Sequence, residues 1–75
     1  MDYKVGKILK FDNYAGIIVD DKNEYLFLDT DLEDNVEVDD LVRFQSEKVN
    51  DTNRAYFVKK LSKKSINWDL WIKIF

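Results

Sequence analysis

The chain has 75 residues, of which 45% are hydrophobic, and a net charge of −3 at pH 7. A chain of this length forms one domain with a small core and leaves no room for a second. The sequence contains no cysteine and no histidine, which excludes disulfides and thiolate metal sites and argues against a catalytic triad or a zinc site. We therefore expect no enzyme, no cofactor and no bound metal.

The sequence shows no targeting or membrane signal. Its first residues, MDYKVGK, have no apolar signal region, and no run approaches the ~20 apolar residues that a membrane-spanning helix needs. A soluble cytoplasmic protein is the expectation.

Charge is distributed unevenly along the chain. Residues 20–47 carry eleven acids against two bases, a net charge of −9, whereas residues 48–75 carry seven bases against two acids, a net charge of +5. A basic side of the fold could therefore face an acidic one, although a solvated surface of mixed sign explains the same counts.

Three short strands are predicted at the start of the chain, at about residues 3–11, 16–20 and 25–28. They are rich in Ile, Val, Leu, Phe and Tyr, and turn-favouring residues separate them at positions 12–13 and 20–23. Both glycines of the chain, Gly6 and Gly16, fall within this antiparallel meander. Glycine inside a strand often marks a sharp bend or a close backbone approach.

The next segment, residues 29–38, is acidic and has few periodic apolar residues, so we predict a long surface connection with room for one short turn of helix. Its acids suggest a calcium loop. However, an EF-hand loop requires glycine at its sixth position and a bidentate glutamate at its twelfth. Counted from Asp29, these positions hold Asp34 and Asp40, so a solvated loop is the better interpretation.

The alternating pattern of a strand returns from Leu41 to Glu47, and a fifth strand follows at residues 54–61, after a polar turn at 50–53. Five short strands with a long connection after the third predict an all-β, five-stranded Greek-key barrel. The patterning alone fits either an OB-fold or an SH3-like barrel.

Five segments stand in a recognisable order and spacing: Gly6–Phe11, Asn13–Ile18, Tyr25–Asp29 followed by Leu32, Asp40–Phe44, and Ala55 with Val58. They resemble, in this order, the segments Gly-x-Val-Lys-Trp-Phe, Lys-Gly-Phe-Gly-Phe-Ile, Val-Phe-Val-His-Phe followed by Ile, Gly-Gln-x-Val-x-Phe from its second residue, and Ala-x-x-Val of cold-shock domains. The resemblance covers about Val5 to Leu61 and implies an OB-fold barrel that binds single-stranded RNA or DNA.

The departures from the family pattern concern its row of outward aromatic side chains, on which bases stack at ~1 to 3 kcal/mol per base. Phe11 is retained from that row. The other positions hold aliphatic, basic or acidic residues, namely Lys10, Ala15, Ile17, Leu26, Leu28 and Asp29. Tyr25 and Phe27 are aromatic, but in this register they are expected to point into the barrel.

Two functions of different classes follow from these observations. The first is weak and largely electrostatic binding of single-stranded RNA or DNA, with the candidate residues Lys7, Lys10, Phe11, Tyr14, Arg54, Lys59 and Lys60. The second is a protein-interaction or dimerisation module that kept the OB barrel but lost the base-stacking face. The resemblance favours the first.

The last fourteen residues, 62–75, lie beyond the resemblance and form an apolar C-terminal extension of the barrel domain 1–61. Their pattern fits a strand or an amphipathic helix, with the helix slightly favoured by Ser65 as N-cap and an Asp69–Lys73 pair. The expected interaction residues are Trp68, Trp71 and Phe75. We predict that Trp68 or Trp71 packs across the substituted barrel face, while crossing to a second chain to make a homodimer, or packing elsewhere on the barrel, are the alternatives.

Overall fold

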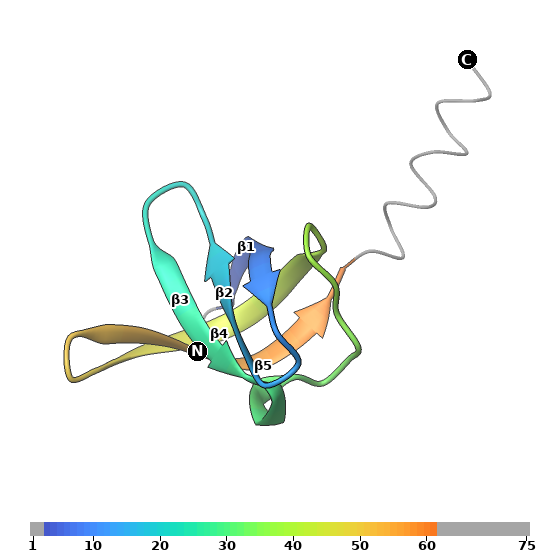
Figure 1. The fold of residues 1–75 in the computed structure, drawn as a ribbon. Coiled ribbons are helices and arrows are strands. Elements are labelled where there is room, and N and C mark those ends of the chain that lie inside the picture. The colour runs from blue at the N-terminus through green and yellow to red at the C-terminus, as the bar shows by residue number, and fades with distance from the viewer. Residues whose placement is uncertain (1–2, 62–75) are drawn as a thin grey trace, which may run out of the picture.

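Five strands follow one another along the chain in a computed structural model that describes residues 3–61. They are β1 (Lys4–Phe11), β2 (Ala15–Val19), β3 (Glu24–Leu28), β4 (Leu41–Val49) and β5 (Thr52–Lys60). The strands pair in the order β1-β2-β3-β5-β4, and β4 closes the barrel on β1 (Figure 1). The predicted all-β, five-stranded OB-type barrel is confirmed, and the strand bounds differ from the predicted ones by one or two residues at most ends.

Local turn chemistry explains where the antiparallel strands end. The Asp12 carboxylate accepts hydrogen bonds from the backbone N–H groups of Tyr14 and Ala15, both at 3.0 Å, and Asn13 takes a φ of 80°. At the β4–β5 hairpin, Asn50 and Asp51 have φ values of 50° and 65°, the pair of positive values that a two-residue type I′ turn needs. Asn and Asp tolerate this region better than other non-glycine residues, so the polar turn residues determine the hairpins.

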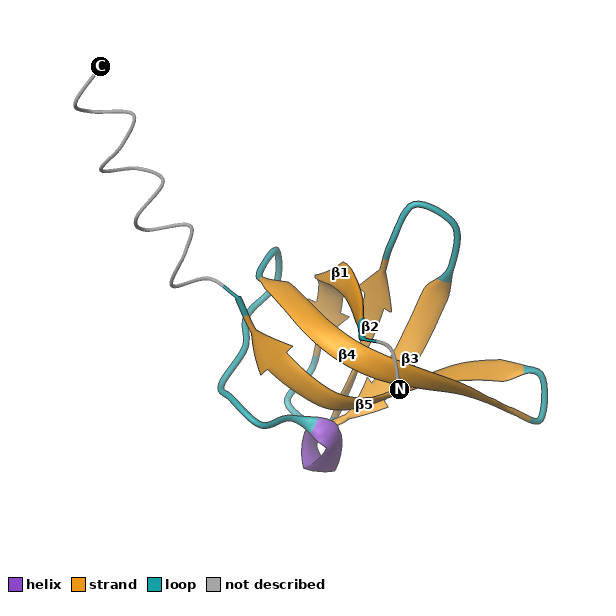
Figure 2. Ribbon diagram, turned by 180° about the vertical axis from the view of Figure 1, so that it is seen from behind, coloured by secondary structure: helices purple, strands orange, loops and turns teal. Residues whose placement is uncertain are grey.

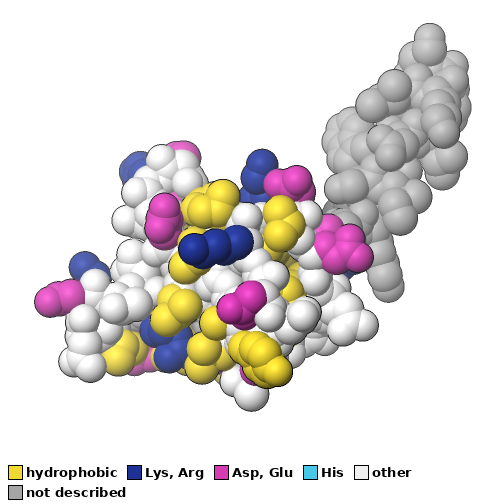
Figure 3. Space-filling model, viewed as in Figure 1, with side chains coloured by type: hydrophobic (Ala, Val, Ile, Leu, Met, Phe, Trp, Pro, Cys, Tyr) yellow, Lys and Arg dark blue, Asp and Glu magenta, His cyan; other side chains and the backbone are white. Residues whose placement is uncertain are grey.

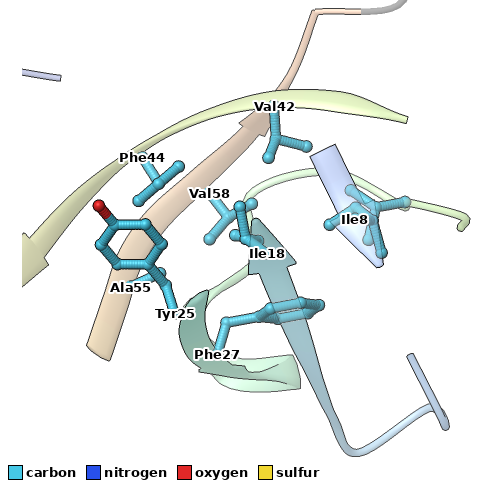
Figure 4. Close-up of a cluster of buried hydrophobic side chains, with 9 residues drawn as sticks. Ile8, Ile18, Tyr25, Phe27, Val42, Phe44, Ala55 and Val58 are labelled. Atoms are coloured by element: carbon cyan, nitrogen blue, oxygen red, sulfur yellow. The ribbon is translucent and has the colours of Figure 1, made fainter. Parts of the chain in front are cut away.

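The barrel is filled by nine buried apolar side chains, most of which Figure 4 labels. They are Ile8, Ile18, Tyr25, Phe27, Val36, Val42, Phe44, Ala55 and Val58. The rings of Tyr25 and Phe44 meet edge to face, with centroids 4.8 Å apart. Burial of each large apolar side chain contributes about 1.5–3 kcal/mol. The inward placement of Tyr25 and Phe27, which the sequence predicted, is confirmed.

The hydroxyl of Tyr25 emerges from this core at the β2–β3 turn. It donates a hydrogen bond of 2.8 Å to the Asp20 carboxylate, whose other oxygen accepts the backbone N–H groups of Lys22 and Asn23. These hydrogen bonds lower the pKa of Asp20, and burial together with the Asp20 contact raises the pKa of Tyr25. The network therefore satisfies the polar end of a buried ring.

Gly6 and Gly16 allow neighbouring strands to approach closely, as the sequence suggested. A Cβ atom at Gly16 would lie 2.4 Å from the backbone oxygen of Lys10 and 2.5 Å from the Phe27 ring. At Gly6 it would lie 2.6 Å from the Ile18 side chain. The tight coiling of β1 and β2 around the core thus depends on the missing side chains.

The acidic connection between β3 and β4 begins with a 3₁₀ turn at Asp29–Asp31 (purple in Figure 2), in agreement with the predicted surface segment and its single turn. It is not confined to the surface, however. Leu32 forms a parallel bridge with Val58 and packs against the core, and Val36 is buried within it. The segment therefore closes one end of the barrel. Residues 3–61 include no helix that is long and apolar enough to cross a lipid bilayer.

Candidate nucleic-acid interface

The outer surface of β1, β2 and β3 carries a row of aliphatic side chains. Cross-strand register places Lys10 opposite Ile17, Ile17 opposite Leu26, and Ala15 opposite Leu28, and directly opposed residues share one face of the sheet. We call the set Ala15, Ile17, Val19, Leu26 and Leu28 the apolar face. Its members are half-buried or exposed, and Figure 3 shows apolar side chains interspersed with charged ones on this side of the barrel.

Three of the five predicted cations form ion pairs with acids of the β3–β4 connection. Lys7 lies 3.7 Å from Asp39, Arg54 lies 3.0 Å from Asp31, and Lys60 lies 3.4 Å from Asp40. The acidic and basic parts of the sequence are therefore brought together at these places, which reduces the positive charge that a phosphate would meet.

Arg54 is the most tightly held of the three cations. Arg54 of β5 is the register partner of Leu26 of β3. Its guanidinium donates a hydrogen bond to an Asp31 oxygen, which also accepts the backbone N–H of Leu28 at 2.9 Å. The two charged side chains are only 21% and 12% exposed, and the guanidinium carbon lies 5.0 Å from the Tyr56 ring centroid. Arg54 thus attaches the β3–β4 connection to the barrel, and its role is structural.

Phe11 is partly buried rather than displayed. Its ring packs on Phe27, with centroids 5.4 Å apart, and its exposed edge borders a hollow that is also lined by Asp29, Glu33 and Asp34. These carboxylates disfavour a phosphate at this edge. Phe11 also lines a second hollow, with Lys10, Asp12 and Ala15, where one cation and one carboxylate lie beside the ring.

Lys10 and Tyr14 remain accessible beside the apolar face. Tyr14 is 76% exposed at the tip of the β1–β2 turn, and Lys10 is exposed on β1. Within residues 3–61, no carboxylate lies in ion-pair distance of Lys10. These two side chains are the part of the predicted set that the structure leaves free on this surface.

Lys59 belongs to a different surface. It is exposed on β5 and stands directly opposite Arg43 of β4, which in turn stands opposite Val5 of β1. The predicted residues thus do not form one patch. Arg43, Tyr3 and Phe57 were not among the predicted site residues. The alternating pattern of Leu41–Glu47 separates Arg43 from the buried Val42 and Phe44, and it is the signal that could have identified Arg43.

The predicted interaction residues Trp68, Trp71 and Phe75 lie outside the described residues, and their packing stays a prediction. The same holds for the domain boundary at Leu61.

The comparisons with known proteins bear on the fold. One similar solved structure is Drosophila Unr CSD456, a cold-shock-domain structure, with a TM-score of 0.68 and 17% sequence identity over 80% of this chain. The barrel has the fold of a cold-shock domain. The similarity covers 27% of the Unr chain, so this chain spans about a quarter of the length of that one. No protein-family model and no curated protein matches the sequence.

The cold-shock fold removes the ambiguity between an OB-fold and an SH3-like barrel that the strand pattern alone left open. Ile17 and Leu26 stand next to each other on the outer surface, where the sequence resemblance implies aromatic side chains.

Proposed function

We propose that this domain binds single-stranded RNA or DNA weakly and mainly through electrostatic contacts. The observation that supports the proposal best is the cold-shock fold together with exposed cations, such as Lys10 and Lys59, that have no carboxylate partner among residues 3–61. OB-fold domains bind single strands by combining a positively charged surface with stacking side chains. Few aromatic side chains remain on the apolar face, so phosphate contacts supply most of the affinity.

A fluorescence titration with a pyrimidine-rich single strand tests this proposal. Contacts from two or three cations give a slope of log affinity against log salt of about −1.4 to −2.1 for a single strand. At least one of Lys10→Ala and Lys59→Ala should flatten the slope, and which of the two does so shows which surface the strand crosses. Lys22→Ala in the β2–β3 turn is the control, because it removes the same charge from an exposed position away from both lysines. Absence of binding at low salt would refute the proposal.

A protein-interaction module is the second candidate, and the apolar face is the observation that favours it. Ile17, Leu26 and Leu28 form an aliphatic surface that another apolar segment can cover, at ~25 cal/mol per Å² of buried area. The segment proposed for this role is residues 66–75, which contain Trp68, Trp71 and Phe75.

A chain that ends at Leu61 tests the second candidate. If residues 66–75 cover the apolar face, the shortened chain should be less stable in urea and less soluble, and it should bind single strands more tightly. If those residues join two chains, the full chain should sediment as a dimer and the shortened one as a monomer. A shortened chain with unchanged stability, solubility and binding would contradict both forms of this candidate.

A further inference from the structure

A second exposed surface of the barrel combines aromatic and basic side chains. It lies over β1, β4 and β5, the last two of which cross the front of Figure 2. We call it the aromatic–basic face and define it as Tyr3, Val5, Lys7, Leu41, Arg43, Phe57 and Lys59. The register places Val5, Arg43 and Lys59 in one row and Lys7 and Leu41 in the next, so these side chains share one side of the sheet.

Arg43 and Lys59 are like charges in directly opposed positions on neighbouring strands. Such a pair destabilises a sheet, and in the described part of the chain no carboxylate lies within ion-pair distance of either cation. An anion bound between them would remove this repulsion. A phosphate group fits this position because a guanidinium can bind two of its oxygens at once.

Tyr3 fixes the position of Arg43. The guanidinium carbon lies 4.1 Å from the Tyr3 ring centroid, and Tyr3 is 49% exposed. The cation is thus held on the barrel surface by a ring and not by a carboxylate, so its charge stays available. The same ring has exposed area on which a base can stack.

Phe57 has a backbone conformation that Asn or Gly adopts more easily than a bulky aromatic residue does. The strand register shifts between Arg43 and Gln45, so that Phe57 and Val58 together stand opposite the single residue Phe44. Val58 is fully buried, whereas Phe57 is the extra, outward residue of this bulge, with 53% of its surface exposed and a φ of 55°. A positive φ is an outlier for a bulky side chain, and Asn or Gly adopts it more easily.

The core does not account for Phe57, because its ring is half exposed and lies outside the buried cluster. Its backbone is strained as well. Strained residues that contribute little to packing are concentrated at binding sites. An exposed ring two positions from Lys59 provides a stacking surface on the same strand as that cation, beside a hollow that Phe57 lines with Gln45, Ser46, Glu47 and Tyr56.

We infer that a single strand of RNA or DNA crosses the aromatic–basic face, with bases on Phe57 and Tyr3 and a phosphate between Arg43 and Lys59. This inference rests on the proposed function and moves its site from the apolar face of β1–β3 to β1, β4 and β5. The exposed aliphatic side chains of the same face would also suit a protein partner. The opposed cations favour a polyanion.

The test uses the full chain and a short fluorescein-labelled oligothymidylate at low salt. Phe57→Asn should weaken binding by between about 5-fold and about 140-fold, the range for loss of one stacked base, and should raise the melting temperature by relieving the strained φ. Arg43→Gln should weaken binding and reduce the salt slope by about 0.7. The combination of weaker binding with higher stability separates a binding role for Phe57 from a structural one, which would lower the melting temperature.

Lys10→Gln and Lys22→Gln are the matched controls, the first at the apolar face and the second at the β2–β3 turn. Both should change binding less than Arg43→Gln does. If Lys10→Gln weakens binding while Phe57→Asn and Arg43→Gln do not, the strand lies on the apolar face, and the inference fails while the proposed function survives. If the unaltered chain does not bind the oligothymidylate at all, the proposed function fails and this inference fails with it.

Discussion

The apolar face lies on β2 and β3, the aromatic–basic face lies on β1, β4 and β5, and the two differ in which of the nearby cations are neutralised. Beside the apolar face, Arg54 is tied to Asp31 and Lys10 has no carboxylate partner among residues 3–61. On the other face, Lys7 is paired with Asp39, whereas Arg43 and Lys59 oppose each other and have no such partner among the same residues. The difference arises from the β3–β4 connection, which delivers Asp31, Asp39 and Asp40 to some cations and does not pair with Arg43 or Lys59. The path of the acidic β3–β4 connection therefore determines which cations remain unpaired, and the number of bases in a strand does not.

The largest expected effect comes from breaking the sheet on which both faces depend. In Gly16→Ala, the new Cβ would collide with the Lys10 carbonyl and the Phe27 ring, and neither can move far because one is backbone and the other is fully buried. We expect a loss of about 3 kcal/mol in the free energy of unfolding. Urea denaturation measures it, with Ala15→Ser as the control on the neighbouring residue. A loss below about 1 kcal/mol would show that β1 can move away from β2.

The next effect compares a partly buried ion pair, Arg54 with Asp31, with an exposed one, Lys7 with Asp39. Asp31→Asn removes the charge that balances the partly buried Arg54, and we expect a loss of about 1–2 kcal/mol. Asp39→Asn is the matched control, because its pair with Lys7 is far more exposed, at 51% and 77%, and should contribute about 0.5 kcal/mol or less. Equal losses in urea denaturation would contradict the distinction between the partly buried Arg54–Asp31 pair and the exposed Lys7–Asp39 pair.

Asp31→Asn also releases Arg54 next to Leu26, and so makes the edge of the apolar face more basic. Binding of a labelled single strand by this variant shows which face is in use. If the strand crosses the aromatic–basic face, affinity should stay within about twofold of the unaltered chain, because Arg54 remains distant from the cation pair. A large gain in affinity would assign the strand to the apolar face.

A smaller effect tests the cation pair through stability alone. Lys59→Glu turns the Arg43–Lys59 repulsion into a cross-strand attraction, which should stabilise the fold by about 0.5 kcal/mol. The gain should decrease with added salt because both side chains are accessible to ions. Lys48→Glu, opposite the uncharged Asn53, is the control and should give no such gain. A destabilised Lys59→Glu variant would show that Arg43 does not experience the charge of Lys59.

The smallest effect concerns the turns at the two ends of the apolar face. Backbone N–H groups of Ala15 and Tyr14 lower the pKa of Asp12, and those of Lys22 and Asn23 lower the pKa of Asp20, each below the ordinary value of 3.8. Because the folded state favours the charged carboxylates, their contribution is complete above pH 3.8 and is lost as the pH falls through the lower folded-state values. Without histidine, the chain has no side chain of ordinary pKa near 6.5 to obscure this acid limb.

Thermal unfolding between pH 6 and pH 2 measures this dependence, and Asp20→Asn should flatten it. The amide keeps an oxygen for the Lys22 and Asn23 N–H groups but has no charge to lose. If the variant unfolds with the same pH dependence as the unaltered chain, Asp20 is not one of the groups that link acid to stability.

The sequence predicted the barrel well because local signals determine it. Alternation identified the strand that holds the buried Val42 and Phe44, turn residues separated the strands, and the glycines marked the close approaches. The buried Val36 was not predicted, since a single apolar residue in an acidic segment has no periodic partner. Its burial depends on how the connection folds back over the barrel end.

The candidate site was harder to predict because its decisive contacts join distant residues. Asp31 and Arg54 are 23 positions apart, and nothing in either local sequence indicates the pairing. The bulge at Phe57 was likewise invisible, because a continuous apolar run does not reveal where one extra residue is inserted into a strand. The resemblance to cold-shock domains predicted the fold and the surface where a site is expected. Which basic side chains remain without an acidic partner depends on tertiary structure, and local sequence does not show it.

Besides the β1–β4 pairing, a second closure joins β3 to β5, and this one has a consequence for how the barrel opens and forms. These strands share one parallel register pair, Leu26 with Arg54, supplemented by the Leu32–Val58 bridge, whereas β4 and β5 pair at seven positions. The meander and the β4–β5 hairpin can each form from neighbouring sequence, but this closure joins residues almost thirty positions apart, and loop-closure entropy delays such contacts in folding. Native-state hydrogen exchange should therefore find β5 amides that face β3 opening at lower free energy than those that face β4.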